Sequence, residues 1–308
     1  MRVAVVDIGT NSTRLLVADV APDGTFTELD RRSTVTRLGH GVDASGSLAP
    51  EAIERVLDTL AIYRRSIDEH QVGETMAVLT SAVRDARNGS EFAARVRDEF
   101  GLDAQTLSGE EEAQLSFLGA TSSREEDAPS PVVVIDIGGG STEFVIGERG
   151  SVAFHVSTQA GSVRQGERFV HHDPPEGDEL AALAEEVRGI FRGAVPEELR
   201  GSVAAAVAVA GTATQLAAID QRLEPYDPAR VHGYRLDQGA CERILAQLAQ
   251  LPEDERAEVQ GLDPARAPTI VVGTLLMLEA MRTFDLESVE VSEHDILRGA
   301  ALRRAGAA

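Results

Sequence analysis

One stretch of the sequence occurs twice, and this repeat constrains the fold more than any other feature. The first copy runs from Val5 to Val17 (VVDIGTNSTRLLV) and the second from Val134 to Ile146 (VIDIGGGSTEFVI). The offset is constant, because 136 − 7 and 142 − 13 both equal 129. Two copies separated by the length of a domain indicate a duplicated domain.

Each copy predicts a β-hairpin, because an apolar strand ends in an acidic residue and a second apolar strand follows the glycine turn at once. Glycine lets the backbone turn sharply and brings N–H groups close to a ligand, and the neighbouring hydroxyls can donate to phosphate oxygens. We therefore expect two phosphate-binding turns that face a cleft between the duplicated domains. The candidate phosphate-binding residues are Gly9, Thr10, Asn11, Ser12, Gly138, Gly139, Gly140, Ser141 and Thr142.

The acidic residue of each copy, Asp7 or Asp136, is placed to hold Mg²⁺ directly or through water. An ordinary Asp-Gly turn would explain a single copy. Two copies a domain apart favour a ligand site.

The rest of the chain alternates between predicted helices and strands, which favours a mixed, mostly parallel sheet in each half. The expected helices cover 51–69, 90–100, 178–192, 237–250, 269–284 and 294–305. The expected strands cover 76–79, 102–107, 203–210 and 287–292, and 80–88 is expected to be a loop.

Domain boundaries follow from a polar break between Thr121 and Ser130, which we interpret as a hinge. We expect one α/β domain over residues 1–120 and a second over 121–294. Whether the C-terminal helix, within 295–308, packs back on the first domain is left open.

Composition excludes several classes of protein. The chain has 51 acidic and 29 basic residues, for a net charge of −22, which argues against general binding to nucleic acid or to an anionic membrane. No apolar run reaches the roughly 18–20 residues that span a bilayer. The N-terminus does not resemble a secretory signal, and the single Cys241 cannot form an intramolecular disulfide, so we expect a cytoplasmic protein.

Three consecutive glutamates begin the predicted helix that precedes the hinge. Ser108 and Glu111 form a capping-box pattern, and the helix dipole accounts for Glu110. Glu112 shares a helical stripe with Leu115, which indicates that it faces protein or a cleft. A carboxylate in that place can deprotonate an attacking water. The same sequence is also compatible with Glu112 as an ordinary charged residue on the surface.

Several arginines lie in or beside the glycine and hydroxyl loops, where a planar guanidinium can grip phosphate. They are Arg14, Arg84, Arg87 and Arg164. For any one of them, the residue type alone favours a solvated or ion-paired side chain over a phosphate contact. The turn Gly211–Thr214 follows a buried strand and is a third candidate anion contact.

Taken together, these segments resemble the exopolyphosphatase/guanosine pentaphosphate phosphatase (Ppx/GppA) family, in its short, two-domain actinobacterial form. The resemblance runs nearly end to end and is carried by motifs in a fixed order. They are DIGTNS at 7–12, RLGHGV at 37–42, TSAVRD at 80–85, SGEEEA at 108–113, DIGGGSTE at 136–143 and AGTAT at 210–214. The resemblance implies a duplicated actin-like, sugar-kinase-like (ribonuclease H-like) α/β fold with an inter-domain cleft.

The resemblance also implies an exopolyphosphatase that removes terminal phosphate from inorganic polyphosphate with Mg²⁺ or another divalent metal. Glu112 matches the family's catalytic base, and Arg84 matches a phosphate contact. Asp136 and Glu143 match acidic positions that serve the metal and the water, with Asp7 as a further metal candidate.

Other functions stay open at this point. A pppGpp 5′-phosphohydrolase would use the same site, and a non-catalytic polyphosphate- or nucleotide-binding regulator is a second class. A sugar or acetate kinase is disfavoured, because Glu112 is placed for water rather than for a substrate hydroxyl. Longer relatives carry a further C-terminal helical domain that this sequence lacks, which leaves the chain-length preference open. A homodimer is compatible with the sequence.

Overall fold

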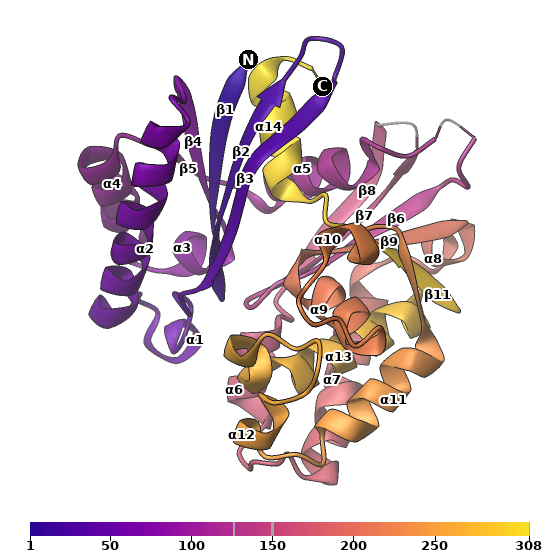
Figure 1. Ribbon diagram of the computed structural model, residues 1–308. Helices are drawn as coiled ribbons and strands as arrows, with labels where there is room; N and C mark the ends of the chain where they lie inside the picture. Colours follow the sequence, from indigo (N-terminus) through magenta and orange to yellow (C-terminus); the bar gives the residue numbers. More distant parts are fainter. Residues whose placement is uncertain (126, 149–150, 308) are drawn as a thin grey trace. The chain divides into compact units, whose positions relative to one another are not determined.

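The computed structural model describes residues 1–125, 127–148 and 151–307 of the chain (Figure 1). The chain divides into two compact units. Unit 1 comprises Met1–Ser122 together with the segment that begins at Asp295, and unit 2 is Ser123–His294. Glu126, within the predicted hinge, lies outside the described residues. The cleft expected between two domains stays a prediction.

Unit 1 contains a five-stranded sheet in the order β3-β2-β1-β4-β5. Its strands are β1 (Arg2–Ile8), β2 (Ser12–Val20), β3 (Phe26–Val35), β4 (Glu74–Leu79) and β5 (Asp103–Thr106). Strands β1 and β2 pair antiparallel, which confirms the first predicted hairpin, and β2 pairs antiparallel with β3. Strand β4 runs parallel to both β1 and β5.

Helices cover both faces of this sheet, so β1 is buried on both sides and reads as a continuous apolar run. Ala4 and Val6 of β1 pack in the same core as helices α2 (Pro50–Glu69) and α4 (Gly89–Phe100). Val3 and Val5 point to the other face, where they pack in a core with α5 (Gly109–Thr121) and α14 (Ile296–Ala305). Figure 1 shows α14 beside α5. Two short helices, α1 (Val42–Ser45) and α3 (Ser81–Asp85), complete the unit.

Helices α5 and α14 approach each other closely enough for their backbones to touch. A Cβ atom on Gly299 would overlap the carbonyl of Leu115, and a Cβ on Gly119 would overlap the carbonyl of Asp295. Only glycine fits at these two positions without moving a helix.

Unit 2 contains a six-stranded sheet in the order β10-β11-β9-β6-β7-β8. Its strands are β6 (Val132–Ile137), β7 (Thr142–Glu148), β8 (Ser151–Thr158), β9 (Ala205–Val209), β10 (Tyr234–Asp237) and β11 (Ser288–Val291). The antiparallel pair β6–β7 confirms the second hairpin. Pairs β6–β9 and β9–β11 are parallel, whereas β7–β8 and β10–β11 are antiparallel.

Two sequence-based expectations about these elements were wrong. The sheets are mixed but not mostly parallel, because β3, β8 and β10 were not predicted and all three pair antiparallel. The segment 80–88, expected to be a loop, contains helix α3.

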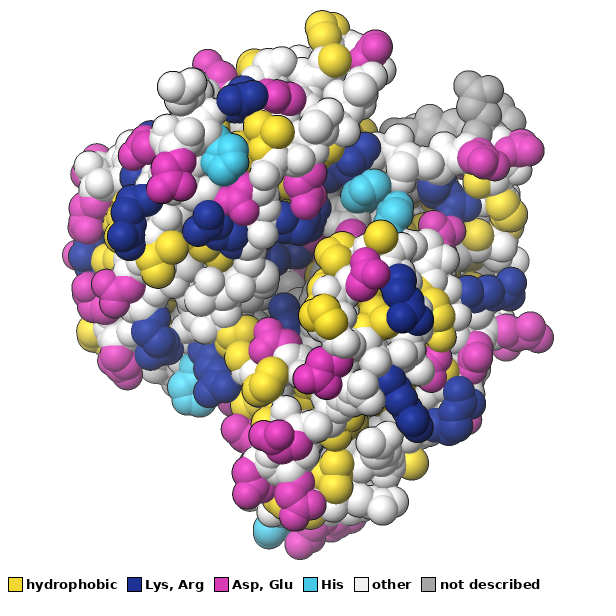
Figure 2. All heavy atoms as spheres, in the orientation of Figure 1, with side chains coloured by type: hydrophobic (Ala, Val, Ile, Leu, Met, Phe, Trp, Pro, Cys, Tyr) yellow, Lys and Arg dark blue, Asp and Glu magenta, His cyan; other side chains and the backbone are white. Residues whose placement is uncertain are grey.

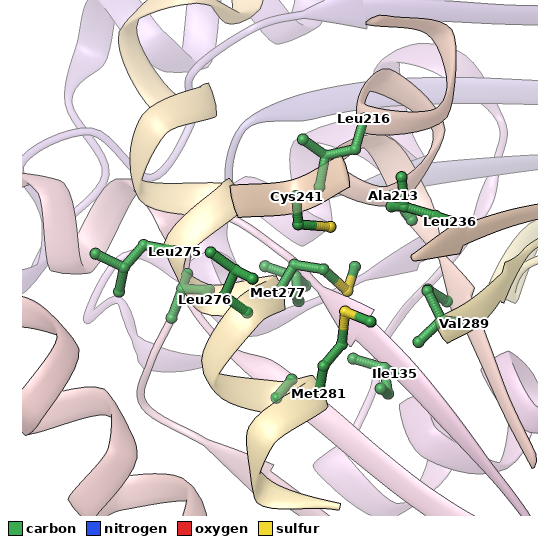
Figure 3. Close-up of a cluster of buried hydrophobic side chains, with 14 of the residues drawn as sticks. Ile135, Ala213, Leu216, Leu236, Cys241, Leu275, Leu276, Met277, Met281 and Val289 are labelled. Atoms are coloured by element: carbon green, nitrogen blue, oxygen red, sulfur yellow. The ribbon is translucent and has the colours of Figure 1, made fainter. Parts of the chain in front are cut away.

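The core of unit 2 is built around helix α13 (Ala267–Thr283), whose residues are buried nearly all round, as expected for a central helix. In Figure 3, Met277 and Met281 of this helix extend toward Ile135 of β6 and Val289 of β11. Cys241 lies in the same core, where burial raises the pKa of its thiol to about 12. A thiol in that environment is a packing group rather than a nucleophile.

The remaining helices of unit 2 connect its strands and helix α13 along the chain. They are α6 (Ser162–Phe169), α7 (Gly177–Ala194), α8 (Glu197–Ser202), α9 (Ala210–Asp220), α10 (Pro228–Val231), α11 (Gln238–Leu248), α12 (Glu253–Arg256) and the 3₁₀ turn Pro264–Arg266. Among the described residues, no helix is both long and apolar enough to cross a bilayer. Acidic and basic side chains are interspersed over the face drawn in Figure 2, as in a solvated surface.

Candidate functional site

The two hairpin turns close in the same way. The N–H of Gly9 donates to the carbonyl of Ser12 at 3.0 Å, and the N–H of Gly138 donates to the carbonyl of Ser141 at 3.0 Å. The repeat in the sequence is therefore a repeat of backbone geometry.

In unit 1, the loop that follows β3 holds the carbonyl groups of the first turn. Gly39 N–H donates to the carbonyl of Thr10 at 2.8 Å. Thr36 and Arg37 N–H groups donate to the carbonyl of Asn11 at 2.9 and 2.8 Å. A Cβ on Gly39 would overlap the Thr10 side chain, so this close approach requires glycine.

In unit 2, the start of helix α6 holds the second turn. Val163 and Arg164 N–H groups donate to the carbonyl of Gly139 at 2.8 and 3.0 Å, and Arg164 Nε donates to the carbonyl of Gly140 at 2.9 Å. A Cβ on Gly161 would overlap the backbone of both turn glycines. Arg164 was a candidate for gripping phosphate, and these hydrogen bonds show that it fixes the turn itself. Gly161 was not identified from the sequence.

These bonds orient the N–H groups of the turns. Because the peptide is planar and trans, a carbonyl and the following N–H point in opposite directions. The N–H groups of Asn11 and Ser12 thus face away from the loop after β3, and those of Gly140 and Ser141 face away from α6. Successive N–H groups presented in this manner form a concave site for an anion.

Helix α3 begins against the first turn. Thr80 N–H donates to the carbonyl of Ile8 at 3.3 Å, and the hydroxyls of Ser81 and Thr10 are 2.9 Å apart. Arg84 lies in the same helix, α3. These contacts therefore connect the helix that carries the Arg84 guanidinium to the first glycine turn.

Arg84 contacts the carboxylate that the sequence singled out. Its Nη1 donates to Glu112 Oε2 at 2.9 Å and to the carbonyl of Leu107 at 3.1 Å. Glu112 is buried, with 9% of its side chain exposed, which confirms that it faces protein rather than open solvent. Its neighbour Glu111 forms the predicted capping box with Ser108, whose backbone N–H lowers the pKa of the Glu111 carboxyl. The two adjacent glutamates therefore have different environments.

Arg14 lies between two buried carboxylates. Its Nε and Nη2 donate to Asp7 Oδ2 at 2.9 and 2.6 Å, and its Nη1 donates to Asp295, the N-cap residue of α14. Burial raises the pKa of Asp7, and Arg14 opposes this shift. Among the described residues, Oδ1 of Asp7 has no hydrogen-bond partner. Asp295 was not singled out from the sequence, because nothing local marks a partner 281 residues from Arg14.

The second hairpin places two acidic residues opposite each other. Asp136 pairs with Glu143 across β6 and β7. Ile135 and Phe144 face the core of unit 2, so both acidic side chains lie on the other face of the sheet, with Cβ atoms about 4.5–5.5 Å apart. Like charges directly opposite each other repel. The pair therefore fits a hard divalent cation.

No cluster of three or more His, Cys, Asp or Glu side chains suited to a metal occurs in the described ranges. Mg²⁺ is usually held by one or two carboxylates that share it with water and with phosphate oxygens of the substrate. A pair such as Asp136 and Glu143 matches that pattern. The proposal that Asp7 also ligates a metal stays a prediction.

The other candidates have distinct places. Arg87 Nη2 donates to the carbonyl of Ser45 at 2.7 Å and so holds the C-terminal end of α1. The Gly211 turn opens α9, and Thr212 Oγ1 donates to the carbonyl of Ile137 at 3.2 Å, which places the turn beside the second hairpin. The guanidinium of Arg266 lies directly over Gly211.

Known proteins match this chain over nearly its full length. Residues 16–303 match the Ppx/GppA phosphatase family. The chain is 38% identical to exopolyphosphatase 2 of Mycobacterium tuberculosis over a 320-residue alignment that covers 99% of both chains.

Solved structures agree with this match. The Aquifex aeolicus PPX-GPPA enzyme is 32% identical, with a TM-score of 0.81 over 98% of this chain and 99% of that one. An exopolyphosphatase from Cytophaga hutchinsonii is 27% identical, with a TM-score of 0.89 over 99% of this chain and 98% of that one. By sequence and by structure, this chain belongs to the Ppx/GppA phosphatase family.

Proposed function

We propose that this protein is an exopolyphosphatase that hydrolyses the terminal phosphoanhydride bond of inorganic polyphosphate, with Glu112 as the general base. The observation that carries the proposal is the placement of Glu112. Its carboxylate is buried, and Arg84 links it to the segment that contacts the first glycine turn. A buried carboxylate beside a phosphate-binding turn is suited to orient water.

In the proposed reaction, the N–H groups of the turns bind the oxygens of the terminal phosphate. Glu112 accepts a proton from water as the water oxygen attacks phosphorus. The bond from phosphorus to the bridging oxygen breaks, inorganic phosphate leaves, and the shortened chain keeps the bridging oxygen. Positioning and electrostatic stabilisation supply most of the catalysis in such reactions.

A divalent metal belongs to this proposal, and Asp136 and Glu143 are the residues that would hold it. When bound, Mg²⁺ neutralises charge on the phosphate oxygens. The single buried cysteine suits a reducing compartment, so we include a cytoplasmic location. A homodimer stays a prediction.

A pppGpp 5′-phosphohydrolase is the second candidate, because its substrate ends in the same kind of phosphoanhydride. The name of the M. tuberculosis relative favours polyphosphate. If the protein were a kinase or a non-catalytic regulator, no phosphate would be released into water.

The test is phosphate release from polyphosphate of defined lengths, pppGpp and ATP, each with Mg²⁺. Release from polyphosphate at the highest kcat/KM supports the proposal. A higher kcat/KM on pppGpp replaces it with the second candidate, and no release from any substrate rejects both.

A further inference from the structure

We infer that Arg84 is a positioning residue for the base Glu112 and that a different edge of the same guanidinium binds the phosphate. The inference rests on the proposed function and deepens it. It concerns how the base is held in place before and during attack.

The contacts of Arg84 divide its guanidinium into two parts. Nη1 donates to Glu112 Oε2 at 2.9 Å and to the carbonyl of Leu107 at 3.1 Å. These two acceptors use both N–H bonds of that nitrogen. Nε is 3.8 Å from Asp85 Oδ1, which is an ion-pair distance rather than a hydrogen bond. Within the described ranges, no hydrogen bond reaches Nη2, which leaves that edge for phosphate oxygens.

The two acceptors of Nη1 lie at the same end of helix α5. Leu107 directly precedes the N-cap Ser108, and Glu112 lies in the first turn. Arg84 therefore fixes the carboxylate relative to the start of its own helix. Because Arg84 belongs to α3, which contacts the first glycine turn through Ser81 and Thr10, the same side chain also fixes the base relative to the phosphate-binding turn.

Two physical demands on the base explain why a guanidinium is needed. A general base must lie within about 2.6–3.2 Å of the proton donor, and an error of about 1 Å can cost 10²-fold in rate. A carboxylate next to a polyanion is also repelled by it, and a cation between the two offsets that repulsion. Lysine supplies the charge but not two separate edges.

A double-mutant cycle with Arg84→Gln and Glu112→Gln tests the inference, using kcat and KM on polyphosphate of one defined length with Mg²⁺. If Arg84 acts through Glu112, Arg84→Gln lowers kcat by about 10–10²-fold. The double variant is then no slower than Glu112→Gln alone, within about threefold, because the positioned group is already absent. Arg84→Lys should recover KM while kcat stays low. This variant also replaces Arg84→Gln in the test if the Gln variant fails to fold.

Glu111→Gln is the matched control, since Glu111 shares the first turn of α5 but caps Ser108 instead of contacting Arg84. Its kinetics should match those of the wild type. The inference is overturned if the two single effects on kcat multiply in the double variant, or if Arg84→Gln raises KM alone. Either result would make Arg84 a phosphate ligand only. A wild-type protein that releases no phosphate rejects the proposed function as well, so the two failures are distinguishable.

Discussion

Arg14 lies directly opposite Asp7 in the first hairpin, at the position where the repeat places Glu143 opposite Asp136 in the second. The duplicated halves have thus diverged in charge at one equivalent position, since 14 + 129 = 143. The first hairpin contains its own cation. The second carries two carboxylates at the equivalent positions.

We therefore predict that metal binding depends on the second hairpin. Glu143→Gln should weaken Mg²⁺ or Mn²⁺ binding by at least the roughly 10–100-fold typical of changes around a metal site. Calorimetry, or Mn²⁺ electron paramagnetic resonance, in the presence of inorganic phosphate measures this directly.

The matched variant is Asp7→Asn in the first hairpin. Because Arg14 already bonds to Asp7, Asp7→Asn should cost less metal affinity than Glu143→Gln. A larger loss of affinity for Asp7→Asn than for Glu143→Gln would place the metal at the first hairpin instead.

The proposed base, Glu112, gives the second prediction. Glu112→Gln keeps the size of the side chain but cannot accept a proton, so kcat should fall by about 10²–10⁴-fold. Binding of polyphosphate should change little or tighten, because a negative charge near a polyanion is removed. Steady-state kinetics and a binding titration measure the two effects separately.

Glu111→Gln is again the internal control, because glutamine also serves in a capping box. Equal loss of turnover in both variants, or near-normal turnover for Glu112→Gln at saturating substrate, would assign the base to another carboxylate, with Glu143 the next candidate.

A third prediction concerns the glycine that supports the second turn. Gly161→Ala places a methyl group where the backbone of Gly139 and Gly140 lies, so the turn must shift. Such overpacking typically costs about 1–3 kcal/mol, and phosphate release should fall with it. Chemical denaturation and activity measurements check both.

Gly166→Ala, within the helix that Gly161 caps, is the control. Its nearest neighbour would be Val272 Cγ2 at 3.6 Å, an ordinary contact. Alanine in a helix interior is favoured over glycine by about 0.5–1 kcal/mol, so this variant should be as stable as the wild type or more stable. Equal destabilisation by both variants would contradict the role given to Gly161.

The fourth prediction is a pH dependence of stability at helix α7. The pKa of Glu179 is lowered from 4.5 to about 2, chiefly by the backbone N–H of Glu176, with His172 and the N–H of His171 adding to the effect. A lowered carboxyl pKa stabilises the fold above the unfolded value, and that contribution is lost as the pH falls through the folded value. The wild type should therefore be more stable than Glu179→Gln above about pH 4.5.

This difference should shrink as the pH falls from about 4.5 to about 2. Thermal unfolding followed by circular dichroism measures it across that range. A difference that stays constant with pH would show that Glu179 acts through packing or capping alone.

The sequence predicted the hairpins because their signals are local. An apolar strand, an acid and a glycine turn lie within a dozen residues, and both copies fold as antiparallel pairs. Strand β3 was missed because it is an edge strand: its sequence, FTELDRRSTV, is mostly polar and only partly buried. The sheets were expected to be mostly parallel because β3, β8 and β10 were all missed.

The contacts within the candidate site could not be predicted, because they join distant parts of the chain. Arg84 and Glu112 are 28 residues apart, and Arg14 and Asp295 are 281 apart. Gly161 supports the second turn in the way that Gly39 supports the first. The segments that lead from each turn to these glycines differ in length, so the constant offset of the repeat does not relate the two glycines. The only signal available was a glycine shortly after the third strand of each half.

The glycine contact between α5 and α14 has a consequence for how the protein is made. On the ribosome, the helix that carries Glu112 emerges before all of Ser123–His294, and its partner α14 emerges after that segment. Until then, one face of β1 and of α5 has no α14 to cover it. Unit 1 therefore cannot finish folding in the order of synthesis, although domains usually do. The Met1–Ser122 part of unit 1 completes its core only after the segment that begins at Asp295 has been made.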